Sequence, residues 1–297
     1  MDLQYLFQFK LCIFGKNINH PQLYIGFENL IVSINNSNSF IGFFDEYGKY
    51  KFSTALFLSN SKRMTQICLI LDNLIYTYQQ MSKSIKVFNI HGYHKFNITL
   101  KKNNDKIIHI LKINHGLNDF FYVINIMNSN IYVFNRQGEY QFKFKKNNSI
   151  FEKKPQFREI CFGLNNLIYV YDKMNHCIQI YNQFGEYQSH FDPKTLNLSG
   201  LFFSKLNNLL FFCDRYNHRI KIFDPYGHFL FQFGLKGSKE GEFKCPTQLF
   251  FLNNLLYIYD YYNDRVQVFQ FLKHQNLYQI LFNQLNKKIS SSCLNFK

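Results

Sequence analysis

The strongest constraint on the fold of this chain is an internal repeat, because the sequence contains six copies of one pattern of about 45 residues. Each clear copy combines an aromatic-rich run, a D-x-x-N turn and a second run in which apolar and polar residues alternate. The clear copies are YVYDKMNHCIQIYNQFGEY from Tyr169, FFCDRYNHRIKIFDPYGHF from Phe211 and YIYDYYNDRVQVF from Tyr257. The fainter copies begin at Val32, Tyr76 and Tyr122. A period of two is typical of β-strands, so each copy predicts strands joined by a tight turn.

The spacing of the copies indicates the architecture. The turn asparagine, or the residue in its place, recurs at steps of 44, 46, 47, 42 and 46 residues, at Asn38, Ser82, Asn128, Asn175, Asn217 and Asn263. A glycine follows ten residues later in five copies, at Gly48, Gly92, Gly138, Gly185 and Gly227. Glycine suits a strand-connecting turn that needs a positive φ. A repeat of about 40 to 50 residues is the length of one propeller blade. The sequence therefore predicts an all-β fold, a six-bladed β-propeller of four-stranded antiparallel blades.

The carboxyl-terminal copies resemble a known family, the NHL repeats. The stretch GLKGSKEGEFKCPTQLFFLNNLLYIYDYYNDRVQVF, from Gly234 to Phe269, is similar to the family pattern of a glycine-rich segment, G-x-F-x-x-P, a strand and D-x-x-N-x-R-V-x-V-F. The resemblance is strong from about residue 155 onward. In the first three copies the family aspartate is replaced by Asn35, Gln79 and Asn125, so these copies rest on spacing and alternation. A six-bladed propeller of another repeat type is the alternative.

A propeller must close, because an open ring leaves exposed sheet edges. The segment YLFQF at Tyr5–Phe9 repeats FLFQF at Phe229–Phe233, which is the expected outer strand of the fifth blade. We therefore expect the N-terminal strand to complete the sixth blade and close the ring. The segment LYQILF at Leu277–Phe282 competes for the same position. The propeller is expected to span residues 1–282, and residues 283–297 are expected to form a basic, serine-containing tail.

Two acid–base pairs flank the turns of the clear copies. They are Asp214 with Arg219 and Asp260 with Arg265. An aspartate and an arginine can form a bidentate ion pair that holds a hairpin together, although the same charges could grip a ligand. The structural interpretation is favoured, because a hairpin staple recurs with the blade whereas a binding site needs to occur only once.

Metal ligands and catalytic groups are sparse on the expected innermost strands. The only plausible polar groups there are His109, Arg158 and Glu159, with His20 just outside. Some propellers that resemble NHL proteins are enzymes, including a zinc- and calcium-dependent lyase, but either metal needs three or more convergent ligands. Motifs for nucleophiles, phosphate loops and dinucleotides are also missing. We therefore predict a protein that is not an enzyme and has no metal and no cofactor; a propeller lyase or hydrolase is the remaining alternative.

The seven cysteines and the hydropathy pattern bear on the compartment. The cysteines form no CxxC pair and are odd in number, which argues against a disulfide framework. No secretory signal is evident, and no apolar run reaches the length of about 18 residues that a membrane span requires. The sequence predicts an intracellular, reducing compartment, either the cytoplasm or the matrix of an organelle with an AT-rich genome.

The net charge of the chain is +15, and its positively charged residues are expected to gather on one face of the propeller. In a four-stranded blade, the turn between strands two and three shares one face with the crossover to the next blade. This face is expected to be basic and interleaved with aromatic residues, which suits phosphate contacts and base stacking. Several NHL proteins bind RNA on that face, so the resemblance implies RNA or a ribonucleoprotein as the partner. An acidic protein partner, with this chain as a scaffold subunit, is the alternative; no sequence-specific DNA-binding motif occurs. The candidate binding residues are Lys83, Lys101, Lys102, Lys153, Lys154, Lys173, Arg215, Tyr216, His218, Tyr261 and Tyr262.

Overall fold

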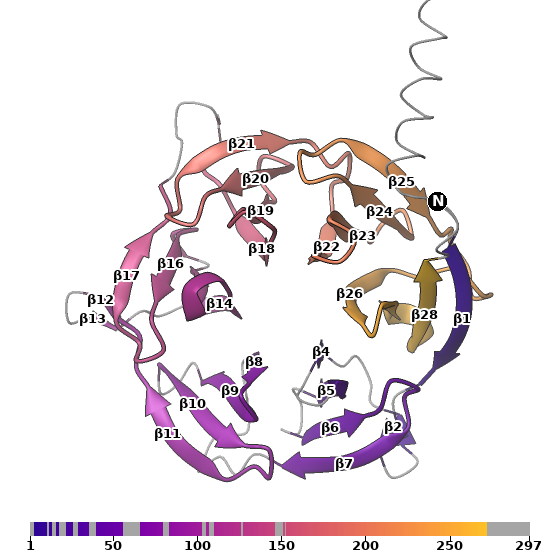
Figure 1. The fold of residues 1–297 in the computed structure, drawn as a ribbon, viewed down its shortest axis with the longest axis horizontal. Helices are drawn as coiled ribbons and strands as arrows, with labels where there is room; N and C mark the ends of the chain where they lie inside the picture. Colours follow the sequence, from indigo (N-terminus) through magenta and orange to yellow (C-terminus); the bar gives the residue numbers. More distant parts are fainter. Residues whose placement is uncertain are drawn as a thin grey trace, which may run out of the picture.

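A computed structural model shows six antiparallel sheets arranged in a ring around a central axis, as predicted (Figure 1). It describes residues 3–10, 12–13, 16–17, 22–25, 29–35, 40–55, 66–79, 83–102, 105–106, 110–125, 127–145, 151 and 153–271. The predicted tail at 283–297 and the competing strand at Leu277–Phe282 lie outside these residues. In each blade one strand lies near the axis and the fourth strand runs along the rim.

The strands of the six blades follow the repeat. Blade 1 contains β4 (Gln22–Ile25), β5 (Ile31–Asn35), β6 (Phe40–Phe44) and β7 (Tyr50–Ala55). Blade 2 contains β8 (Gln66–Leu71), β9 (Leu74–Gln79), β10 (Ser84–Asn89) and β11 (His94–Ile98). Blade 3 contains β14 (Ile110–His115), β15 (Phe121–Asn125), β16 (Ile131–Phe134) and β17 (Tyr140–Lys143).

The last three blades have the same layout. Blade 4 contains β18 (Phe157–Phe162), β19 (Ile168–Asp172), β20 (Cys177–Tyr181) and β21 (Tyr187–Phe191). Blade 5 contains β22 (Leu198–Ser204), β23 (Leu209–Asp214), β24 (Arg219–Phe223) and β25 (Phe229–Phe233). Blade 6 contains β26 (Pro246–Leu252), β27 (Leu255–Asp260), β28 (Arg265–Phe271) and the N-terminal strand β1 (Leu3–Phe9).

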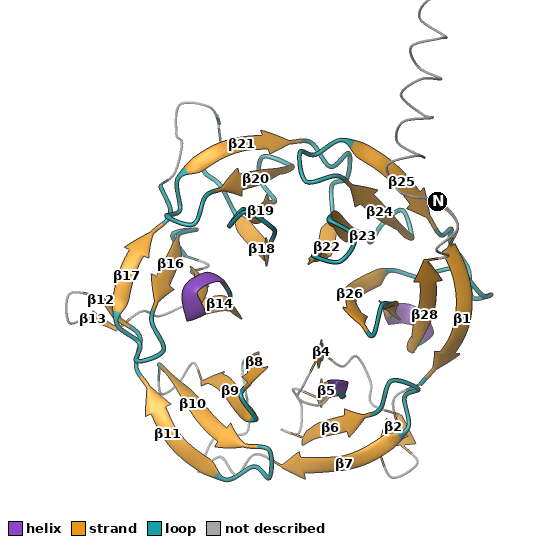
Figure 2. Ribbon diagram, in the orientation of Figure 1, coloured by secondary structure: helices purple, strands orange, loops and turns teal. Residues whose placement is uncertain are grey.

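Short segments complete the described part of the chain. They are the two-residue pairs β2 (Cys12–Ile13) with β3 (Lys16–Asn17) and β12 (Lys101–Lys102) with β13 (Asp105–Lys106), and the 3-10 turns η2 (Leu117–Asp119) and η3 (Tyr261–Asn263). Besides these two turns, Asn29 is the only other described residue in a helical conformation, so the fold is almost entirely β (Figure 2). No described helix has the length and apolar character needed to cross a membrane.

The N-terminal strand closes the ring, as the sequence predicts. β1 pairs antiparallel with β28, from Leu3 opposite Phe271 to Phe9 opposite Val266. The ring of Tyr5 also packs edge-on against Phe269, with the ring centroids 5.8 Å apart. Sequence-distant segments thus form one sheet, and the sixth blade gains its outer strand from the opposite end of the chain.

Apolar side chains hold adjacent blades together. The six hydrophobic clusters of the described residues each lie between two neighbouring blades, so the core is a ring of blade interfaces. Between blades 6 and 1, Tyr257 and Val266 pack with Leu23 and Phe44. Because the second and third strands are buried on both faces, they are continuous apolar runs, whereas the outer strand β21 has an exposed face.

Candidate nucleic-acid interface

Three buried aspartates position the turns between the second and third strands in blades 4, 5 and 6. Asp172, Asp214 and Asp260 end the second strands of these blades, and each residue is 0% exposed. Each carboxylate accepts a hydrogen bond from the turn asparagine three residues later. Each also accepts one from the crossover that enters the same blade. A buried carboxylate must be satisfied in this way, so each aspartate fixes both its turn and its crossover.

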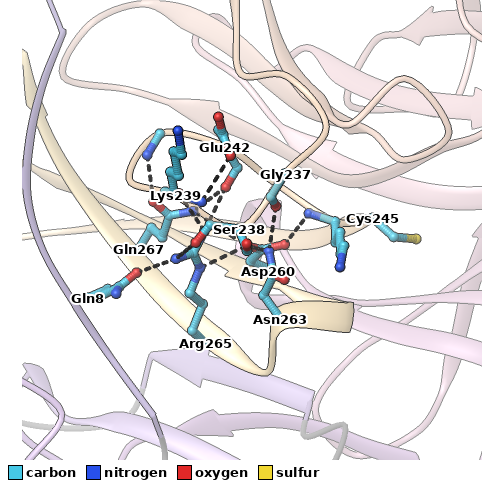
Figure 3. A network of polar contacts seen from close by, with 12 residues as sticks. Gln8, Gly237, Ser238, Lys239, Glu242, Cys245, Asp260, Asn263, Arg265 and Gln267 are labelled. Carbon is cyan, nitrogen blue, oxygen red and sulfur yellow. Dashed lines mark hydrogen bonds and ion pairs between the residues drawn. The ribbon is translucent and has the colours of Figure 1, made fainter.

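The network in blade 6 is the most extensive (Figure 3). Asp260 accepts hydrogen bonds from the backbone N–H of Lys244 at 2.5 Å and from Asn263 Nδ2 at 2.6 Å. Arg265 Nε lies 3.0 Å from Asp260 Oδ2, so the predicted pair is in contact through one guanidinium nitrogen. The other two nitrogens donate to Gln8 Oε1 at 2.6 Å and to the carbonyl oxygens of Ser238, Lys239 and Glu242 at 2.8, 2.7 and 2.8 Å. Arg265 therefore ties the turn, the crossover and the closing strand β1 together.

Blade 5 corrects the other predicted pair. Asp214 forms its ion pair with Lys221, at 3.3 Å, whereas Arg219 Nε donates to the carbonyl oxygen of Asn217 at 3.1 Å. The Lys221 ammonium also donates to the carbonyl oxygens of Pro193 and Lys194. One buried carboxylate is balanced by one buried cation, and a second buried cation would lack a counter-charge. The Arg219 guanidinium therefore lies outside this buried ion pair.

Blade 4 satisfies its aspartate without a cation. Gln179 Nε2 donates to Asp172 Oδ2 at 2.8 Å, and Gln179 occupies the same repeat position as Lys221 in blade 5. The backbone N–H groups of Gln156 and Met174 donate to Asp172 Oδ1 at 2.8 and 3.1 Å. Several neutral donors thus replace the ion pair at this position.

The second residue after each of these aspartates is exposed to solvent. Tyr216 and Tyr262 occupy the second position after the aspartate in blades 5 and 6, and they are 69% and 67% exposed. Tyr261 is partly buried, and its ring centroid lies 5.1 Å from that of Tyr262. Lys173 is exposed and Arg215 is half-buried at the first position after the aspartate. The turns therefore expose aromatic rings and cations, and the buried aspartates hold the backbone of each turn in place.

The crossovers bring further predicted residues to the same turns. Asn175 Nδ2 donates to the carbonyl oxygen of Lys153 at 3.1 Å, so the exposed Lys153 and its neighbour Lys154 lie beside the blade 4 turn. The backbone N–H of Arg215 donates to Asn197 in the crossover into blade 5. We call the surface that these turns and crossovers form the blade 4–6 arc. It contains Lys153, Lys154, Lys173, Arg215, Tyr216, His218, Tyr261 and Tyr262.

His218 joins the turn of blade 5 to the crossover into blade 6. Its Nδ1 accepts a hydrogen bond from the backbone N–H of Cys245 at 3.0 Å, which requires a neutral ring. Partial burial and the nearby charge of Lys236 lower the pKa of His218 below its ordinary value. Lys236, Lys239 and Lys244 are exposed on the same crossover and extend the positive charge of the arc.

Three predicted residues lie away from the blade 4–6 arc. Lys83 is exposed in the turn of blade 2, with a left-handed φ of 52°. Lys101 and Lys102 form β12 on the outer edge of the ring (Figure 1). The backbone N–H of Lys101 donates to the carbonyl oxygen of Gly138 in the turn between strands three and four of blade 3, although the sequence predicts that the crossovers lie beside the turns between strands two and three. Because the outer strands run along the rim, this crossover begins beside the next blade at the rim and not beside the turns between strands two and three.

The inner strands carry few chemical groups. Lys112 Nζ lies 2.5 Å from Glu159 Oε2, so this pair links blades 3 and 4 near the axis. Arg158 Nε is buried and has no hydrogen-bond partner among the described residues. His20 and His109 lie outside the described residues. Within the described ranges, no group of three or more His, Cys, Asp or Glu residues could hold a metal ion.

Sequence reasoning missed the residues that shape the opposite turns. Five turns between strands three and four begin with an aspartate or asparagine that accepts the backbone N–H groups two and four residues later. These residues are Asp45, Asn89, Asn135, Asn182 and Asp224. Their regular position three residues before each repeated glycine could have predicted these turns from the sequence, because Asp and Asn side chains accept hydrogen bonds from the backbone N–H groups of such turns.

Comparison with known proteins supports the fold alone. No protein-family model and no curated protein matches the sequence, so membership of the NHL family stays a prediction. The chain is similar to virginiamycin B lyase from Staphylococcus aureus, with 15% identity, a TM-score of 0.59, and coverage of 84% of this chain and 80% of that one. A catalytically inactive variant of that enzyme with quinupristin matches at 11% identity and TM-score 0.62, over 91% of this chain and 100% of that one. A streptogramin B lyase matches at 14% identity and TM-score 0.59, over 84% and 78% of the two chains. These likenesses place the chain among proteins with the propeller fold.

Proposed function

We propose that this protein is a non-enzymatic binding platform that holds single-stranded RNA, alone or within a ribonucleoprotein assembly, on the blade 4–6 arc. The observation that carries the proposal is the combination of unbalanced cations and exposed rings. Lys153, Lys173 and Arg215 form no ion pair with a carboxylate in the described part of the chain. Such charges are available to phosphates, whose neutralisation releases counterions.

The exposed tyrosines favour RNA over a purely acidic partner. Tyr216 and Tyr262 lie at equivalent positions in adjacent blades, and both rings are mostly exposed. Every base has a face that can stack on such rings, and each stack contributes about 1 to 3 kcal/mol. Positive charge alone would serve an acidic protein equally well. The tyrosines therefore favour RNA among the two partners that the sequence leaves open.

The hydrogen-bond networks beneath the arc support a rigid platform. The carboxylates of Asp172, Asp214 and Asp260 hold the turns and crossovers in place before any ligand arrives. Binding then costs little loop ordering. The lyase activity of the structural neighbours is not transferred to this chain, because a likeness at 11 to 15% identity concerns the fold.

Fluorescence anisotropy with a labelled 12-nucleotide single-stranded RNA tests the proposal. Affinity should fall with salt, with a slope of about 0.7 per phosphate contact, and Lys153→Gln or Lys173→Gln should lower that slope. Tyr216→Ala and Tyr262→Ala should each weaken binding about 5- to 150-fold, which corresponds to about 1 to 3 kcal/mol of stacking.

Tyr226→Ala is the matched control. Tyr226 belongs to the same blade as Tyr216 and is 77% exposed, but it lies in the turn between strands three and four. Its loss should leave RNA affinity unchanged. Equal effects of the Tyr216 and Tyr226 changes, or poly-glutamate binding as tight as RNA and indifferent to both, would overturn the proposal in favour of a charge-driven protein partner.

A further inference from the structure

Blade 4 contains a pocket of about 610 Å³ beside the arc. Its walls come from the crossover into the blade, from the turn between β19 and β20, and from the end of the outer strand β21. The lining includes Phe151, Lys153, Met174, His176, His190 and Asp192. Asp192 begins the crossover that leads to the blade 5 turn, so the pocket lies at one end of the blade 4–6 arc.

One wall of the pocket is aromatic and held in place. The rings of Phe151 and His190 meet edge to face, with their centroids 5.1 Å apart. Tyr187 supports both, because its ring lies 6.2 Å from that of Phe151 and its hydroxyl lies 2.6 Å from His190 Nδ1. This contact occupies Nδ1 and leaves His190 Nε2 for a ligand, since the side chain is exposed. Met174, which is 41% exposed, adds an apolar surface.

The polar groups of the pocket carry both signs of charge. Burial raises the pKa of Asp192, but hydrogen bonds and the charge of Lys194 outweigh this and hold the pKa below its ordinary value. The carboxylate accepts the backbone N–H of Lys194 at 2.6 Å and lies 2.8 Å from its ammonium. About four acceptor sites belong to an ionised carboxylate, so some remain for a ligand. Lys153 supplies an exposed cation to the pocket lining, from the crossover into the blade.

The geometry points to a pocket that takes one base of the bound strand and prefers a base with an exocyclic amino group, an inference that rests on the proposed function. A planar base suits the wall of Phe151 and His190, because aromatic side chains stack on every base. Asp192 accepts N–H donors, and an amino base offers more of them than uracil does. Lys153, whose exposed cation belongs to the same lining, would contact the phosphate of that nucleotide. Guanine fits best, since its ring N–H and its amino group donate side by side.

Binding of two 12-nucleotide RNAs, rU12 and r(UG)6, tests this inference. The wild-type protein should bind r(UG)6 more tightly, and His190→Ala and Phe151→Ala should weaken that binding about 5- to 150-fold. Asp192→Asn should remove the preference for r(UG)6 while it leaves the affinity for rU12 within about 2-fold, because a single amide offers fewer acceptors to the base. Phe184→Ala is the control, because Phe184 is 61% exposed at the other end of the same blade.

The possible failures are distinguishable. Binding of both RNAs that depends on Tyr216 and Tyr262 but ignores His190 and Asp192 would overturn the base pocket and leave the platform standing. Absence of RNA binding by the wild-type protein would overturn both. His190→Gln, which is polar and similar in size, provides a second variant if Phe151→Ala lowers the melting temperature.

Discussion

Blades 4 to 6 and blade 3 share one fold but hold the turns between their second and third strands differently. In blade 4, Asp172 accepts hydrogen bonds from the turn and also from the crossover N–H of Gln156. In blade 3, Asn125 stands at that position, and its carbonyl oxygen accepts the backbone N–H groups of Met127 and Asn128 at 3.0 and 3.2 Å. A carboxylate has about twice the acceptor capacity of an amide oxygen. An acidic residue at this position can therefore tie a crossover to its turn as well.

The blade interfaces show a second difference. Tyr169 in blade 4 donates its hydroxyl to the carbonyl oxygen of Pro225 in blade 5 at 2.9 Å, and Tyr257 donates to Glu46 in blade 1 at 3.0 Å. Tyr122 occupies the same repeat position in blade 3, but its buried hydroxyl has no hydrogen-bond partner among the described residues. Burial raises the pKa of Tyr122 to about 12. The same apolar scaffold thus forms with or without the polar contact.

The largest expected effect concerns the blade 6 network. Arg265→Met should destabilise the protein by about 3 to 5 kcal/mol, because Asp260 would remain buried and charged without its partner. Asn125→Ala at the neutral position of blade 3 should cost about 1 kcal/mol. Urea unfolding of both variants measures the difference. Equal losses would show that the buried charge does not distinguish blade 6 from blade 3.

Blade 5 offers a sharper version of the same comparison. Lys221→Met should cost about 3 kcal/mol, since Asp214 loses its buried cation. Lys221→Gln should cost only about 1 kcal/mol, because glutamine at this position already satisfies Asp172 in blade 4. Thermal melts of the two variants provide the measurement. A glutamine variant as unstable as the methionine variant would mean that blade 5 requires the charge itself.

The interface tyrosines should respond in opposite directions. Tyr169→Phe should destabilise by about 1 kcal/mol, because the carbonyl oxygen of Pro225 loses a donor. Tyr122→Phe should be neutral or slightly stabilising, because it removes a buried hydroxyl that has no described partner. Chemical denaturation of the pair tests this, and a destabilising Tyr122→Phe would reveal a hydrogen bond at that hydroxyl.

The smallest expected effect depends on pH. The pKa of His218 is lowered in the folded protein, so protons bind the unfolded chain more readily. The contribution of His218 is therefore present above its unfolded pKa of about 6.5 and is lost as the pH falls through the lower folded pKa. Stability measured at pH 7.5, 6.5 and 5.5 should fall more steeply in the wild-type protein than in His218→Gln. Parallel pH profiles would exclude a role of His218 at the junction of blades 5 and 6.

The sequence by itself determined the fold. Hydrophobic alternation and turn residues act over a few neighbours, so six periodic copies predicted six blades, and the alternating run RVQVF of the last clear copy forms the start of β28. The similarity of Tyr5–Phe9 to Phe229–Phe233 also predicted the closing strand, because equivalent positions in a repeat need similar side chains.

Only the tertiary structure decided which residues meet. Sequence spacing could not show that Asp214 pairs with Lys221 rather than with Arg219, because both cations reach the end of the same strand pair. It also could not separate Lys101 on the rim from Lys153 on the arc, since that depends on how the outer strands run around the ring. The pocket of blade 4 brings together a crossover, a turn and an outer strand that are up to about 40 residues apart. The pairing of charges and the course of the outer strands depend on distances between residues that are far apart in the sequence. A sequence pattern does not contain those distances.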